Sequence, residues 1–177
     1  MKNYNVDKIK AQFPALNRMV WDKPLVYLDS AASMQKPQKV LDAIQSSYSF
    51  NYSNVHRGLH KLSEEATSDY EGARKKIANF INCSDKEVIF TSGATAAINL
   101  IAYSWGLKNL LPGDEIIITI AEHHANIVPW QIIAQQKGVK IIAANIIPDE
   151  DFNSEIIKSL VTENTKIIAF PHVSNVL

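Results

Sequence analysis

The chain has 177 residues, 46% of them hydrophobic, which is enough for a domain with an apolar core and argues against intrinsic disorder. Eighteen basic and eighteen acidic side chains cancel, so there is no basic excess for nucleic acid and no acidic tail. The N-terminus lacks the apolar segment of a secretory signal, and the longest apolar stretch, residues 116–121, is too short to span a membrane. With one cysteine, Cys83, there is no internal disulfide framework, and we expect a soluble cytoplasmic protein that binds neither nucleic acid nor membranes.

The first half of the chain predicts short helices and one short strand. A helix over residues 7–13 should end at the proline that follows it. Residues 25–28 predict a strand. Apolar residues at helical spacing predict a helix over 37–48, with proline in its first turn, and a second helix over 63–80 with Ser63 as its N-cap.

In the second half, strands alternate with helices. This order predicts right-handed crossovers and a mainly parallel sheet, hence an α/β fold. The helix over 95–105 is almost wholly apolar, so we expect it to be buried. The expected strands are 87–91, 115–119, 139–144 and 166–170, and the expected helices are 95–105, 126–137 and 154–161.

Ligands of open α/β sheets bind beyond the carboxyl ends of the strands, so the residues after each strand are the candidates for a site. After the first expected strand, Gly93 permits a tight turn into a helix. Thr95 and the first free N–H groups of that helix can hold a phosphate, assisted by the helix dipole. Tight packing alone also explains small residues at such a turn.

Two further candidates follow later strands. His123 could lie over a planar aromatic ligand, although a histidine at a helix entry often has no such role. Its neighbour His124 should point elsewhere, and no cysteine or histidine cluster accompanies the pair, so we expect no metal site. Asn175 could hydrogen-bond a phenolic oxygen or a carboxylate, or simply form a turn. Together the three positions suit a ligand with a phosphate arm and a flat heteroaromatic ring.

Five motifs follow one another along the chain: residues 27–32 (YLDSAA), 54–58 (NVHRG), 88–99 (VIFTSGATAAIN), 122–131 (EHHANIVPWQ) and 172–175 (HVSN). In this order and at this spacing they resemble the signatures of group II, SUF-type cysteine desulfurases in the class V aminotransferase family. The resemblance covers essentially the whole chain.

The resemblance implies the fold-type I architecture of enzymes that use pyridoxal 5'-phosphate (PLP). Residues 1–177 would be the N-terminal segment plus part of the large, mainly parallel-sheet domain, with the rest of that domain and the small C-terminal domain absent. It implies conversion of L-cysteine to L-alanine and an enzyme persulfide, which supplies sulfur for iron–sulfur cluster assembly. A homodimer and a sulfur-acceptor protein of the SUF system are the implied partners.

The resemblance also implies roles for individual residues. Ser92, Ala94 and Ala96 depart from the family, which often has Arg, Thr and Glu there, but the backbone donors of the phosphate turn remain. Thr95 and Ala96 would bind the PLP phosphate, and His123 would stack on the PLP ring. Asn175 would contact the ring hydroxyl and the substrate carboxylate. The residues that would line the substrate entrance are Ala31, Ala32, His56 and Arg57.

The family's Schiff-base lysine and persulfide cysteine lie further on than Leu177, so no catalytic residue is assigned and we expect a truncated part that is inactive alone. Cys83 follows the end of a predicted helix, so we expect it to be an ordinary packed thiol and not the persulfide cysteine. Two alternatives stay open. One is selenocysteine lyase or another class V PLP enzyme, and the other is a non-enzymatic remnant or a subunit completed by a separately encoded C-terminal half.

Overall fold

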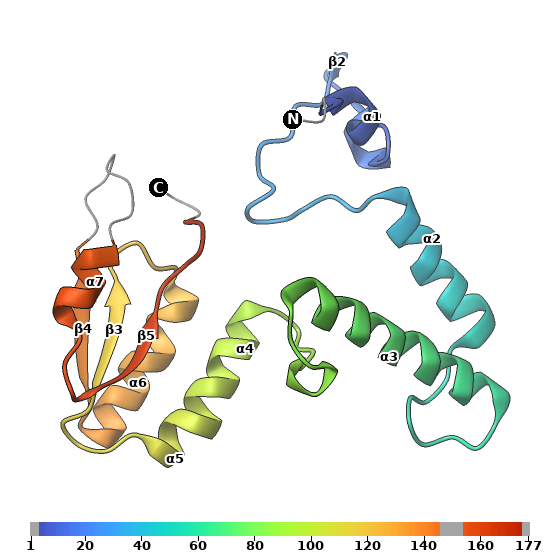
Figure 1. The fold of residues 1–177 in the computed structure, drawn as a ribbon. Helices are drawn as coiled ribbons and strands as arrows, with labels where there is room; N and C mark the ends of the chain where they lie inside the picture. Colours follow the sequence, from blue (N-terminus) through green and yellow to red (C-terminus); the bar gives the residue numbers. More distant parts are fainter. Residues whose placement is uncertain (1–3, 146–153, 175–177) are drawn as a thin grey trace. The chain divides into compact units, whose positions relative to one another are not determined.

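The computed structural model describes residues 4–145 and 154–174 of the protein (Figure 1). The chain divides into two compact units, Met1–Ile89 and Phe90–Leu177. Within the described segments, no helix combines the length and the apolar character needed to cross a membrane.

The N-terminal unit is built mainly from helices. A small antiparallel hairpin joins β1 to β2 across Trp21 and Asp22, which both take positive φ angles, 50° and 60°. The chain also makes 3-10 turns at Pro14–Asn17 and Asp85–Glu87 and a π-helical turn at Ser47–Asn51. The elements are α1 (Val6–Lys10), β1 (Met19–Val20), β2 (Lys23–Pro24), α2 (Gln38–Ser46) and α3 (Lys61–Ile81).

Three expectations for this half need correction. The helix expected over 7–13 stops earlier, at Lys10, before the 3-10 turn that begins at Pro14. The strand expected over 25–28 is absent, because the chain pairs earlier, in the β1–β2 hairpin. The strand expected over 87–91 is also wrong, since a capping box at Ser84 closes a 3-10 turn there and no described strand pairs with the residues that follow.

Helix α3 begins differently from the prediction. Its N-cap is His60, whose Nδ1 accepts a hydrogen bond from the N–H of Ser63 at 3.4 Å, and Ser63 already lies inside the helix. The Ser63 side chain is 1% exposed and bonds to the preceding loop instead. The helix ends at Ile81, and the residue that caps it, Asn82, has a φ of 57°, the left-handed conformation typical of helix ends.

The C-terminal unit is α/β, which confirms the predicted fold class. Its sheet has the order β4-β3-β5, and both pairs are parallel, with Ile117 opposite Ile142 and Ile168. All three strands form within one residue of their expected bounds. The elements are α4 (Ala94–Ile101), α5 (Leu107–Asn109), β3 (Glu115–Thr119), α6 (Val128–Lys137), β4 (Lys140–Ala144), α7 (Ser154–Leu160) and β5 (Thr165–Ala169).

The core of this unit lies on both faces of β3. On one face, Ile116 packs with Trp130 and Ile133 of α6. On the other, Ile117 packs with Ile157 of α7. Because alternate residues of a strand point to opposite faces, the apolar strand β3 contributes side chains to the core on each side of the sheet.

The expectation that the helix over 95–105 is buried is only partly met. Ala102 is fully buried, whereas Ile101 and Trp105 are 51% and 43% exposed. The helix also changes to a π-helical turn at Ala102–Gly106 before α5. Within the C-terminal unit, only one face of this helix packs against the core. Its apolar composition therefore predicted more burial than the structure shows.

Candidate functional site

The N-terminus of α4 is the candidate phosphate site. Its N-cap, Gly93, has φ 156° and ψ 177°, a conformation that residues with a Cβ rarely adopt, and it contributes no side-chain cap. The Thr91 hydroxyl donates to the Gly93 carbonyl at 3.0 Å and closes the turn. The first N–H bonded within the helix is that of Ala97, which donates to the same carbonyl at 3.0 Å. The N–H groups of residues 94–96 therefore lie at the open helix end.

Such a helix end favours an anion. Three backbone N–H groups converge there, and the helix dipole adds partial positive charge. Thr95 and Ala96, the predicted phosphate ligands, occupy the second and third positions of α4. Both the N–H groups and the Thr95 hydroxyl can donate to phosphate oxygens.

His123 follows β3, as predicted, and begins the 3-10 turn His124–Asn126. Its Nδ1 accepts a hydrogen bond from the N–H of Ala125 at 3.1 Å, so the neutral ring carries its proton on Nε2. The rings of His123 and His124 are nearly perpendicular, at 86°, with their centroids 6.2 Å apart. Among the described residues, no group of three potential ligands could hold a metal ion.

A chain of side-chain hydrogen bonds crosses the loop that carries His123. The Thr119 hydroxyl donates to one oxygen of Glu122 at 3.0 Å, and the Asn126 amide donates to the other at 2.8 Å. The Trp130 indole N–H then donates to the Asn126 carbonyl oxygen at 2.9 Å. Thr119 and Trp130 are 1% and 3% exposed, so both ends of the chain are anchored in the core.

This network ties the end of β3 to α6 and so fixes the backbone on both sides of His123. The motifs considered above do not point to this network. The sequence signal for it is the spacing of Glu122, Asn126 and Trp130, four residues apart, which is typical of side chains that contact one another along a helix.

We expect Asn126→Ala to lower the free energy of unfolding by about 1–3 kcal/mol, because it leaves the buried indole N–H of Trp130 and an oxygen of Glu122 without their partner. Urea unfolding followed by circular dichroism measures the change. Gln131→Ala, at an exposed position of α6 next to Trp130, is the matched control. Equal losses in the two variants would contradict a role for the network.

The remaining candidates lie elsewhere. Ala31 and Ala32 occupy an exposed turn of the N-terminal unit, closed by a hydrogen bond from the Ser33 N–H to the Asp29 carbonyl at 3.0 Å. Asn175 lies outside the described residues. The roles expected for these three residues stay predictions.

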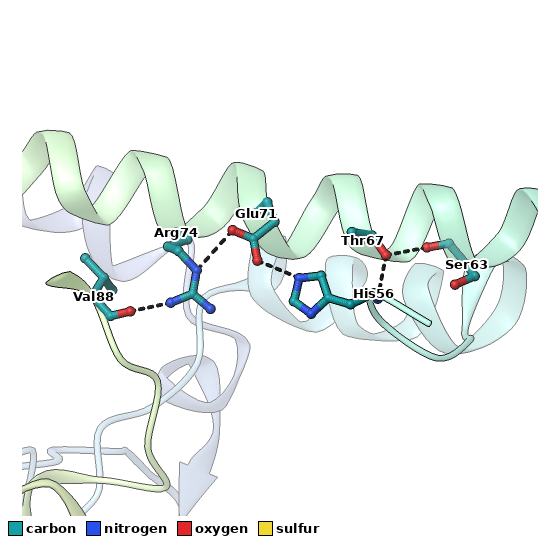
Figure 2. A network of polar contacts seen from close by, with 6 residues as sticks. All are labelled: His56, Ser63, Thr67, Glu71, Arg74 and Val88. Carbon is teal, nitrogen blue, oxygen red and sulfur yellow. Dashed lines mark hydrogen bonds and ion pairs between the residues drawn. The ribbon is translucent and has the colours of Figure 1, made fainter. Parts of the chain in front are cut away.

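His56 and Arg57 are exposed on the loop before α3, and His56 belongs to a polar network along that helix (Figure 2). Its Nε2 lies 2.8 Å from Oε1 of Glu71, whose Oε2 accepts from Arg74 Nε at 3.0 Å. Arg74 in turn donates to the carbonyl of Val88. The hydrogen bond to His56, with help from the Arg74 charge, holds the pKa of the Glu71 carboxyl below its ordinary value.

The comparisons with known proteins cover nearly the whole chain. Residues 26–177 match the family described as Aminotransferase class-V. A Vibrio cholerae serotype O1 protein described as "Probable cysteine desulfurase" is 50% identical over 173 residues, which are 97% of this chain and 43% of that protein. The "Cysteine desulfurase" of Salmonella newport is 47% identical over 175 residues, 98% of this chain and 43% of that protein.

A solved structure shares the fold. The apo structure of a cysteine desulfurase from Thermococcus onnurineus NA1 matches with a TM-score of 0.87 at 30% identity, covering 99% of this chain and 42% of that one. The chain thus spans 43% of the length of the curated relatives described above. The family match extends over most of the sequence, includes every predicted site residue and agrees with the resemblance read from the motifs. The chain therefore belongs to the aminotransferase class-V family.

Proposed function

We propose that the chain is the N-terminal, cofactor-cradling part of a PLP-dependent cysteine desulfurase, which converts L-cysteine to L-alanine and an enzyme persulfide as a source of sulfur for iron–sulfur clusters. The observation that carries this proposal is 47–50% identity, over nearly the whole chain, to proteins described as cysteine desulfurases. The partners we propose are L-cysteine, a sulfur-acceptor protein of the SUF system and a second copy of the protein in a homodimer. The two units would both be parts of one large domain.

Two features of the C-terminal unit fit PLP. The turn at Gly93 is open, since no atom lies within 4 Å of the place where a Cβ would stand, and the N–H groups of residues 94–96 are suited to a phosphate. His123 is exposed within the same unit, and the turn that follows it packs against α4. When bound, PLP supplies the electron sink that carbon–sulfur bond cleavage requires.

The chain's own residues then have distinct tasks. Thr95 and Ala96 would hold the phosphate through backbone N–H groups, which would fix one end of the cofactor. The His123 imidazole, with its proton on Nε2, would cover one face of the ring and keep water from it. Asn175 would contact the ring hydroxyl and the substrate carboxylate. The substrate entrance would be lined by Ala31, Ala32, His56 and Arg57.

A chimera tests the proposal. This chain replaces the matching 43% of the Salmonella newport cysteine desulfurase, and alanine formation from L-cysteine is measured with added PLP and reductant. We expect turnover well above the background of free PLP. The intact Salmonella enzyme and this chain alone are the controls, and the chain alone should form no alanine above background. A folded chimera that binds PLP but forms no alanine would overturn the proposed function.

A further inference from the structure

The loop that carries His56 is fixed to α3 through its backbone. The Ser63 hydroxyl donates to the Asn54 carbonyl at 2.6 Å and accepts from the Gly58 N–H at 3.0 Å, so one buried side chain holds both sides of His56. Gly58 has to be glycine here, because a Cβ would stand 2.4 Å from the Cβ of Ser63. The Thr67 hydroxyl accepts from the N–H of His56 at 2.9 Å (Figure 2).

These bonds hold His56 in an uncommon conformation. Its φ is 70°, a left-handed value that residues with a side chain rarely adopt and that costs conformational energy. Because the backbone is fixed in this way, the direction of the imidazole depends on the partners of its ring.

The ring has two partners on α3. It stands nearly perpendicular to the ring of Tyr70, at 84° with 5.6 Å between the centroids, and its Nε2 lies 2.8 Å from Oε1 of Glu71. Glu71 cannot turn away freely, because Arg74 Nε holds its other oxygen at 3.0 Å and the Arg74 guanidinium lies 5.0 Å from the Tyr70 ring centroid. Two other acidic side chains of α3 have different partners. Asp69 accepts a hydrogen bond from Asn51 at 2.8 Å, and Glu65 pairs with Lys61 at 3.7 Å.

We propose that Glu71 is a positioning residue that fixes the His56 imidazole with Nε2 held and Nδ1 presented to the substrate. In the neutral ring, Nε2–H donates to the carboxylate, which leaves the lone pair of Nδ1 as the acceptor for a donor group of the amino-acid substrate, its ammonium or its thiol. Within the described part of the chain, no hydrogen bond occupies Nδ1. The proposal rests on the proposed function, in which His56 lines the substrate entrance.

Nuclear magnetic resonance of the purified protein tests the ring position without any cofactor. In the wild-type protein, the His56 ring should carry a proton on Nε2 and show cross-relaxation with the Tyr70 ring. Glu71→Ala should lose the cross-relaxation, whereas Glu71→Gln, which keeps an acceptor oxygen without the charge, should retain it. Glu65→Gln, on the same helix, should leave it unchanged. An unaltered ring signal in Glu71→Ala would overturn the proposal.

A kinetic measurement in the chimera tests the link to the substrate. Glu71→Ala should raise KM for L-cysteine about three- to tenfold, the size of one lost hydrogen bond, with a smaller change in kcat, and Glu71→Gln should restore most of the difference. An unchanged KM in a variant whose ring signal is lost would refute the role toward substrate. A chimera without turnover refutes the proposed function instead, and the ring measurement still decides whether Glu71 positions His56.

Discussion

Replacing Ile133 by alanine is expected to lower the free energy of unfolding by about 2–5 kcal/mol. Ile133 is a fully buried residue of α6. It belongs to the same core cluster as Leu110 and as Ile116 of β3. Its Cγ2 also lies 3.7 Å from the position where Gly106 would carry a Cβ, so the π-helical turn Ala102–Gly106 packs closely against it. Truncation would leave a cavity with well-packed walls on three elements, and such walls cannot collapse without moving the sheet.

The change is measured by urea unfolding followed by far-ultraviolet circular dichroism. Ile120→Ala removes the same atoms from a side chain that is 55% exposed, and we expect it to cost less than about 1 kcal/mol. Similar losses in both variants would show that the core around α6 is not packed as described.

The second large effect concerns His123. In the chimera with the Salmonella enzyme, we expect His123→Ala to weaken PLP binding by about 1 kcal/mol, roughly fivefold, as one stacking contact is lost. Turnover should fall further, by about tenfold or more, because a cofactor ring that is free to tilt no longer presents its reacting atoms in the required geometry. PLP absorbance and alanine formation from L-cysteine give the two quantities.

His124→Ala is the matched control. The two histidines are adjacent and exposed, yet their rings are nearly perpendicular, so only one of them can cover a given ligand face. We expect the control to keep PLP affinity and turnover within about twofold of the parent, as is usual for an exposed position. If the effects of the two variants were exchanged or equal, the stacking role of His123 would be wrong.

Local patterns predicted the C-terminal unit well. The apolar run at 115–119 and the β-branched runs near 140 and 166 became the three strands of a parallel sheet, and Gly138 ended α6 in the left-handed conformation, with φ 68°. These features depend on residue type and spacing alone. A strand that is apolar on both faces can bury both of them only in the interior of such a sheet.

Strands expected in the first ninety residues or so failed for a different reason. Residues 87–91 have strand-like composition, but a strand exists only when another strand completes its hydrogen bonds, and no described segment does so. The prediction of Ser63 as an N-cap failed similarly, because its hydroxyl is committed to Asn54 and Gly58 of the folded loop.

The sequence by itself determined the family, the parallel sheet and the positions of Thr95, Ala96 and His123, since each depends on motifs or on residues close along the chain. The tertiary structure alone decided what holds His56. Its partner Glu71 lies fifteen residues further along the chain, on the helix that the His56 loop packs against. Such partners are selected by how a loop folds back onto a helix, and the distance between two side chains after folding is not encoded in their spacing along the chain.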